Sequence, residues 1–360
     1  VSPGMAVLHP RHIPALKRRS LAIAAGAAVI GLGVAWTIAW HQIASGMRDR
    51  LETWAEARRA EGLTVSHKGL AIEGFPFAWQ VRVSEPVIAG AGSAAWAWQG
   101  EALEARFTPA DYRDVALRFP GDHRLAAGGG ALSGTWRVRA ARPEGRILLY
   151  PDGRLNRLEF DFGDATLIRL PDEKAFQAVR LQGAATVPRP AASDPRAETF
   201  TVTIDIDSLS PVEPPVANFG PLVRTVRLDL AAKGRLPGGR FSEALRAWRD
   251  DGGTVEINHV KVRWGPVDAE VSGTLTLDAQ DRPLGAFSAR WRGYNETIDA
   301  LQVAGHIGPW PAAGTKMALT ALARQQADGG RQIELPITLQ DGRVYIAGIP
   351  VMRLQPLRLD

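Results

Sequence analysis

An apolar run near the start of the chain, LAIAAGAAVIGLGVAWTIAW at residues 21–40, contains no charged residue. At 1.5 Å per residue, a helix of this length spans about 30 Å, the thickness of the hydrocarbon core of a bilayer. Trp36 and Trp40 fall at its exit end, where indole rings settle among lipid headgroups. A cleaved signal peptide has a shorter apolar region and a small-residue cleavage site, so this run favours an uncleaved transmembrane helix.

Residues 41–62 continue the helical pattern, and Gly62 is suited to end the helix. The side chains that recur on one side are those of Met47, Leu51, Trp54 and Arg58. A basic amphipathic helix can lie on lipid headgroups, but acidic residues are interspersed in this segment. The pattern therefore favours a juxtamembrane stalk helix that packs against the domain that follows.

From Leu63 onward the period of the pattern changes from 3.6 to 2. Residues 267–277 alternate apolar and polar side chains, which is typical of a strand with one buried face. Three further segments alternate in the same way: 132–138, 200–206 and 333–339. The pair Asp341–Gly342 after the last of these is a strong type I′ hairpin signal. One-sided strands joined by short turns predict antiparallel pairing.

The sequence thus predicts a mainly β (α+β) fold. We expect residues 63–360 to form one large, strongly curved antiparallel sheet, open or half-barrel, with a few helices packed on it. Segment 241–253 is predicted to be one of these helices, with Ser242 as its N-cap. Its residues Leu245 and Trp248 share one face.

A second helical stretch is expected within 311–330. Loops rich in proline and small residues are predicted at 186–196 and 210–221. These loops leave open a division of the β-rich region into two halves near residue 240.

The stretch GFPFAW, residues 74–79, interrupts the strand pattern. Pro76 lacks a donor N–H and Gly74 permits a bend, so the two predict a corner where a strand turns. The corner presents the rings of Phe75, Phe77 and Trp79. In one interpretation these rings plug an end of the core, because large aromatics dominate cores. In the other they line the mouth of an apolar groove that faces the membrane.

Further tryptophans lie near or within predicted strands: Trp96, Trp98, Trp136, Trp264 and Trp291. So many indole rings in one β-structure indicate a wide apolar interior. A packed core and a lipid-filled trough both account for them. For the trough, we take Phe75, Phe77, Trp79, Trp136, Trp264 and Trp291 as the candidate groove residues.

Charge supports a membrane topology rather than nucleic-acid binding. The formal net charge is +5, and the first 47 residues contain four basic residues and no acidic one. The remainder has 39 basic against 38 acidic residues, which is too balanced for a non-specific nucleic-acid binder. Lys17, Arg18 and Arg19 precede the apolar run, so residues 1–20 are expected to form a cytoplasmic tail. The domain at 63–360 is then expected outside the cytoplasm.

Motifs for catalysis are not found in the sequence. There is no cysteine, so disulfides, thiolate metal sites and a cysteine nucleophile are excluded. No nucleophile elbow, zinc-protease motif or phosphate-binding loop occurs. We expect no cofactor, no metal and no enzymatic activity, although a hydrolase site assembled from distant residues is not excluded.

Three stretches resemble a proteobacterial envelope family known only as domain of unknown function 2125: the GFPFAW corner, residues 241–293 and the terminal residues 335–359. Gly-Phe-Pro and G-x-L-x-L-D patterns are also similar to those of AsmA-like lipid-transfer proteins. The family resemblance implies an inner-membrane, periplasmic location and transfers no catalytic residue.

Two functions follow as hypotheses. In the first, a single-pass inner-membrane protein binds a hydrophobic envelope component, such as a phospholipid, in its periplasmic domain. In the second, the domain is a scaffold that contacts another envelope protein through its sheet and helices.

Overall fold

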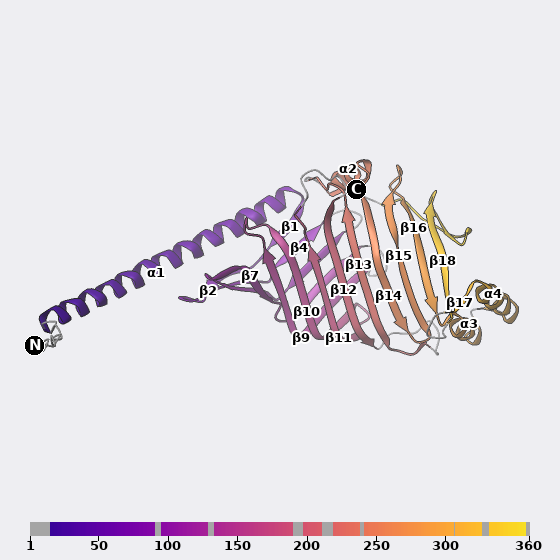
Figure 1. The fold of residues 1–360 in the computed structure, drawn as a ribbon, viewed down its shortest axis with the longest axis horizontal. Helices are drawn as coiled ribbons and strands as arrows, with labels where there is room; N and C mark the ends of the chain where they lie inside the picture. Colours follow the sequence, from indigo (N-terminus) through magenta and orange to yellow (C-terminus); the bar gives the residue numbers. More distant parts are fainter. Residues whose placement is uncertain are drawn as a thin grey trace, which may run out of the picture.

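The computed structural model confirms the predicted fold class: a long apolar helix followed by a large antiparallel sheet that does not close, with a few helices (Figure 1). The residues that the structure describes are 15–90, 95–128, 133–189, 197–210, 219–237, 241–305, 307–325 and 331–357. The basic residue Arg11 and most of the predicted loops at 186–196 and 210–221 lie outside these ranges.

Helix α1 (Ala15–Ala60) joins the predicted transmembrane and juxtamembrane segments into one uninterrupted rod of 46 residues, about 69 Å long. Residues 24–36 are exposed on every side, and the rod projects from one end of the sheet (Figure 1). Its last turns pack on the domain, as expected of a stalk, through Ala44, Met47 and Ala55. Leu51 and Trp54 are exposed, so the packed side is rotated from the predicted one.

The first eight strands form two arms. The β1 arm holds β1 (Leu63–Ser66), β4 (Val87–Gly90), β5 (Trp96–Gly100) and β8 (His123–Ala127). The β2 arm holds β2 (Gly69–Glu73), β3 (Trp79–Ser84), β6 (Ala102–Thr108) and β7 (Asp111–Arg118). The chain passes back and forth between the arms. Each pass is therefore one long strand folded in its middle.

Strand β9 (Gly134–Leu149) belongs to both arms. Its first half pairs with β8, from Gly134 opposite Ala127 onward, and its second half pairs with β7. The folded positions of successive passes thus line up as a crease across the sheet. On β10 (Leu155–Leu170) the crease falls at Asp164, which has a φ of 52°.

The crease continues along the next two strands, β11 (Lys174–Thr186) and β12 (Glu198–Ser210), at Val179 and at Ser208, which has a φ of 55°. At the crease the apolar side chains switch between even-numbered and odd-numbered positions. Phe160 and Phe162 are followed by Ala165 and Leu167 on β10, so alternation resumes one residue out of phase. Since a shift of one residue inverts the faces of a strand, the change of phase keeps apolar side chains on the same side of the folded sheet.

Beyond the crease the sheet continues as an antiparallel meander, and β12 to β14 pair across residue 240. The remaining strands are β13 (Val223–Lys233), β14 (Thr254–Trp264), β15 (Val267–Leu277), β16 (Pro283–Arg292), β17 (Arg324–Gln325), β18 (Arg331–Gln340), β19 (Arg343–Ile346) and β20 (Ile349–Arg353). The predicted strand at 267–277 is confirmed. Asp341 and Gly342 both have positive φ between β18 and β19, which confirms the hairpin.

Among the residues that the structure describes, three short helices accompany the sheet: α2 (Phe241–Asp250), α3 (Tyr294–Val303) and α4 (Pro309–Leu322). Helix α2 covers one end of the strands, and α3 and α4 form a pair at the end of the molecule far from α1 (Figure 1). Ser242 lies inside the first turn of α2, so the predicted N-cap is wrong. The second predicted helix ends at Leu322, and α3 was not predicted from the sequence.

Candidate functional site

The GFPFAW corner is the β2–β3 turn, and it packs against helix α1. The indole Nε1 of Trp36 donates a hydrogen bond to the carbonyl of Pro76 (2.9 Å), and that of Trp40 donates to the carbonyl of Ala78 (3.1 Å). Trp79 is only 3% exposed and stacks on Trp40, with the ring centroids 6.3 Å apart. Two indole donors on backbone carbonyls and a buried aromatic stack fix the end of the apolar span to the sheet.

The rings of the corner divide between packing and exposure. Phe75 is half-exposed and lies edge-on to Trp40 at 5.6 Å. Phe77, by contrast, is 82% exposed. Phe75 and Trp79 therefore pack against α1, and none of the three rings lines the groove described next. The predicted corner at Gly74 and Pro76 is present as a turn.

A groove of about 520 Å³ lies between β5 and β8 of the β1 arm and strands β9 to β12. Its lining residues are all apolar: Trp96, Ala97, Leu125, Ala126, Ala127, Trp136, Val138, Leu167, Phe176, Ala178, Leu181, Ile206 and Leu209. They come from six strands, β5 and β8 to β12, and on β11 and β12 they lie on both sides of the crease. Trp136 is the one candidate groove residue that the structure places in this lining, among the residues described.

The crease makes this groove possible. Ala178 and Leu181 both line it although they are three residues apart, because the strand changes face at Val179 between them. Ala165 and Ala178 pair across β10 and β11 and are almost fully buried at the floor. Small side chains at the crease leave room for the large rings of Trp96 and Trp136 in the same lining. Trp96 remains 45% exposed.

His123 lies next to the groove, paired with Val138 of its lining. The imidazole is buried, stacked parallel on Trp98 at 5.9 Å and edge-on to Phe119 at 5.8 Å. Within the described part of the chain, neither ring nitrogen has a hydrogen-bond partner. A buried polar ring without a partner is costly, so His123 is a weak point of the aromatic core beside the groove.

Trp264 and Trp291 lie away from the groove. The indole of Trp264 contacts Phe219 edge-on at 5.5 Å and donates to the carbonyl of Gly220 at 3.0 Å. It belongs to a cluster with Ala300 of α3. Trp291 stands in β16 between the strand partners Ala269 and Ile333. Trp264 thus packs in the cluster beside α3, and Trp291 lies within the sheet.

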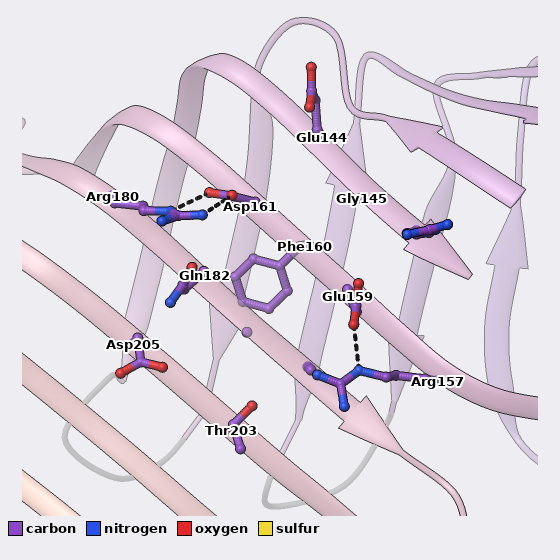
Figure 2. A pocket seen from close by; sticks show the side chains of 13 residues that line it. Glu144, Gly145, Arg157, Glu159, Phe160, Asp161, Arg180, Gln182, Thr203 and Asp205 are labelled. Atoms are coloured by element: carbon purple, nitrogen blue, oxygen red, sulfur yellow. Dashed lines mark hydrogen bonds and ion pairs between the residues drawn. The ribbon is translucent and has the colours of Figure 1, made fainter. Parts of the chain in front are cut away.

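A second depression, of about 470 Å³, lies on the other face of β9 to β12 (Figure 2). Its ionised lining residues are Glu144, Arg146, Arg157, Glu159, Asp161, Arg180 and Asp205. Figure 2 shows Arg180 turned toward Asp161 (Nε to Oδ1, 2.9 Å) and Arg157 turned toward Glu159. The arginine and carboxylate side chains alternate across neighbouring strands.

Pairing neutralises this face. The hydrogen bond from Arg180 holds the pKa of Asp161 below its usual range, and that from Arg146 does the same for the pKa of Asp114. Arg227 pairs with Asp205 at 3.0 Å. With four acidic and three basic side chains in the lining, neither an anion nor a cation finds a concentrated field. We therefore regard the apolar groove as the candidate functional site.

The groove offers hydrophobic contact and shape rather than chemistry. Among the described residues, no three histidine or acidic side chains converge as metal ligands. A volume of about 520 Å³ falls within the range of small-molecule sites. An elongated apolar ligand is the kind of molecule that such a surface binds.

Fold and site together define a β-rich protein with an N-terminal apolar helix, long enough for a membrane anchor or a signal sequence, and an apolar groove in its sheet. A family model described as "Uncharacterized protein conserved in bacteria (DUF2125)" matches residues 40–355. The chain therefore belongs to the DUF2125 family. No curated protein and no solved structure shows detectable similarity to it.

Proposed function

We propose that this protein is anchored in the bacterial inner membrane by α1 and binds the acyl chain of an envelope lipid in its apolar groove. The observation that carries the proposal is the groove lining, in which every residue is apolar and two are tryptophans, Trp96 and Trp136. A binding role, not a catalytic one, follows from this lining. The patterns similar to those of AsmA-like lipid-transfer proteins point to the same class of ligand.

The energetic argument concerns exposed apolar surface. Trp96 and Leu125 leave nearly half of their side-chain surface to water in the groove. Burial of apolar surface contributes about 25 cal/mol per Å². An acyl chain that covers these side chains gains stability from both its own desolvation and theirs, so occupancy is favourable without polar anchors.

The proposed topology places the N-terminus in the cytoplasm and the β-rich domain in the periplasm. The basic residues before the span favour this orientation. The apolar rod at residues 24–36 is exposed on all sides, as a helix in contact with lipid is, whereas a core helix is mostly buried.

The test uses the full chain in vesicles that contain a phospholipid with a photoactivatable acyl chain. Cross-linked peptides are mapped by mass spectrometry. We expect cross-links on β5, β8 and β11 in addition to those on α1. Cross-links on α1 alone contradict the groove assignment.

A matched pair of variants sharpens this test. Leu125→Asp places a charge in the groove lining, whereas Val179→Asp places one on an exposed residue, 60% open to solvent, just outside the lining. We expect Leu125→Asp to abolish the cross-links on β5, β8 and β11 and Val179→Asp to leave them unchanged. Equal labelling of the two variants overturns the proposal.

A scaffold function is the second candidate, and specific exposed surfaces favour it. Helices α3 and α4 expose Val303, Trp310, Met317 and Leu322, and β20 is an edge strand that exposes Ile349 and Val351. Exposed apolar patches and free strand edges are typical of protein contacts. Recovery of a stoichiometric protein partner that is lost in Trp310→Asp, with no lipid cross-links on the groove strands, favours this function over the first.

A further inference from the structure

The β2–β3 turn lies beside the apolar span and not beyond it. Trp36, whose indole bonds the carbonyl of Pro76, is four residues before the end of the run at Trp40. Four residues of helix correspond to about 6 Å. The tip of the turn therefore overlaps the last turn of the proposed membrane segment along the direction of the helix axis.

The part of the turn that points away from α1 is apolar. Between Gly74 and Trp79 the sequence GFPFAW has no charged residue, and Phe77 at its tip is 82% exposed. The hydrogen bonds from Trp36 and Trp40 engage Pro76 and Ala78 on either side of Phe77. Phe77 is thus held in a solvent-exposed position next to the helix, and the exposure of an apolar ring to water is unfavourable.

The neighbouring turn has an interfacial composition as well. Strand β3 pairs with β6, with Trp79 opposite Phe107, so the β6–β7 turn lies next to the β2–β3 turn. Just after it, Tyr112 is exposed and the guanidinium of Arg113 lies 5.9 Å from the centre of its ring. Aromatic rings and basic groups at the same depth are typical of the headgroup region of a bilayer.

We infer that the β2–β3 turn is a second membrane contact: Phe75 and Phe77 insert into the headgroup and upper acyl region of the leaflet from which the β-rich domain emerges. The occupant of this exposed apolar surface is the bilayer itself. The turn is joined to α1 by the hydrogen bonds from Trp36 and Trp40, and these fix its depth relative to the span. This inference rests on the proposed membrane anchoring.

Two contact points determine an orientation that one helix leaves free. A single span permits rotation of the domain about the helix axis, whereas a turn inserted at one side of the helix selects one rotation. The β2 arm then lies against the membrane. The β1 arm, which runs from the crease to the opposite ends of the strands, carries the groove away from that contact.

The test exploits the absence of cysteine from the chain, because each single-cysteine variant carries one label. The full chain is placed in vesicles of phosphatidylcholine and phosphatidylglycerol, and the cysteine is labelled with the fluorophore NBD. Three positions are compared: Phe77→Cys at the tip, Val34→Cys on the exposed face of α1, and Ala175→Cys on exposed β11 at the opposite end of the strands. Quenching by phospholipids that carry a spin label near the headgroup or deep in the acyl chain reports depth.

We expect headgroup-level quenching at position 77, quenching at position 34 and an aqueous label at position 175. A quenched label at 34 with an aqueous label at 77 overturns the inference and leaves the anchoring intact. Aqueous labels at both 34 and 77 overturn the anchoring and the inference together. Circular dichroism spectra that match the unmodified chain confirm that the exposed substitutions have not altered the fold.

Discussion

The indole rings of Trp40 in α1 and Trp79 in β3 stack at 6.3 Å with only 11° between their planes, and both are buried. Phe107 of β6 also stacks on Trp79, with the ring centroids 5.7 Å apart. The pair is the centre of the cluster that joins the apolar helix to the sheet. Helix and sheet are therefore one packed unit, because a buried aromatic stack is lost if either element moves away.

Removal of this stack has a large expected cost. Trp79→Ala should lower the free energy of unfolding by about 3–4 kcal/mol, the usual cost of removing a buried tryptophan. A double-mutant cycle with Trp40→Ala should give a coupling of about 1 kcal/mol between the rings. Urea denaturation in detergent, followed by circular dichroism, measures both. Trp310→Ala is the control, because that ring is 88% exposed and its loss should be nearly neutral. Strictly additive effects at positions 40 and 79 contradict the stack.

Two glycine substitutions should act with opposite signs. Gly74 has a φ of 100°, and a Cβ there would lie 2.8 Å from the backbone oxygen of Ala78. Gly74→Ala should therefore destabilise the protein by about 2 kcal/mol or more. Gly46 lies within α1 with open space around it, so Gly46→Ala should stabilise by about 0.5–1 kcal/mol. Thermal unfolding of the two variants side by side measures the difference, and a neutral Gly74→Ala contradicts the geometry of the turn.

His123 offers a stabilising substitution. A phenyl ring is planar and aromatic like the imidazole, although larger, and brings no unpartnered nitrogen into the contact with Trp98 and Phe119. His123→Phe should raise the free energy of unfolding by about 1 kcal/mol, whereas His123→Ala should lower it because it leaves a cavity. Urea denaturation at pH 7 separates the two. A loss of stability in His123→Phe would indicate that the ring nitrogens are hydrogen-bonded in solution.

Asp278 should make stability depend on pH. Partial burial raises the pKa of its carboxyl, but the backbone N–H of Arg282 (2.9 Å), the guanidinium of Arg282 (2.7 Å) and the N–H of Gln280 (2.9 Å) outweigh this and hold the pKa below its usual value. A depressed folded-state pKa stabilises the protein above the unfolded-state pKa of about 4, and that stability is lost as the pH falls through the lower folded value.

The corresponding variant is Asp278→Asn. Its free energy of unfolding should be about 1.5 kcal/mol lower than that of the unmodified chain at pH 7, and this difference in stability should narrow below pH 4. Denaturation curves at several pH values measure this narrowing. Asp251→Asn, at an exposed carboxylate, is the control and should show little difference at any pH. A gap that stays constant between pH 7 and pH 3 would contradict the role assigned to the charge of Asp278.

Local periodicity was enough to predict much of the fold. The alternation at 267–277 gave β15 within its observed bounds, and Asp341–Gly342 gave the β18–β19 hairpin, because both signals are contained in a few consecutive residues. The apolar run and the stalk pattern gave α1. Helix α3 was missed because its sequence, YNETIDALQV, starts after a glycine with a φ of 73° and lacks a side-chain cap.

The candidate site was only partly predictable. Trp136 was chosen for its place in a strand, but the contact of Trp36 with Pro76 spans 40 residues and leaves no trace in periodicity. The crease did leave a signal: apolar positions change parity at Gly163–Asp164 on β10 and again at Ser208 on β12. A change of phase at matching points of successive strands indicates a folded sheet, and this signal locates the groove floor.

Helix α1 runs without interruption from the apolar span into its packing against the sheet. A rod of this kind has no joint, so under the proposed membrane anchoring the domain cannot swivel independently of the apolar segment. Any tilt imposed on the span, for example by a thinner membrane, is transmitted as a lever movement that is greatest at α3 and α4, the end of the molecule farthest from the helix (Figure 1). With α1 anchored as proposed, bilayer thickness sets how far the distal end of this protein reaches from the membrane surface.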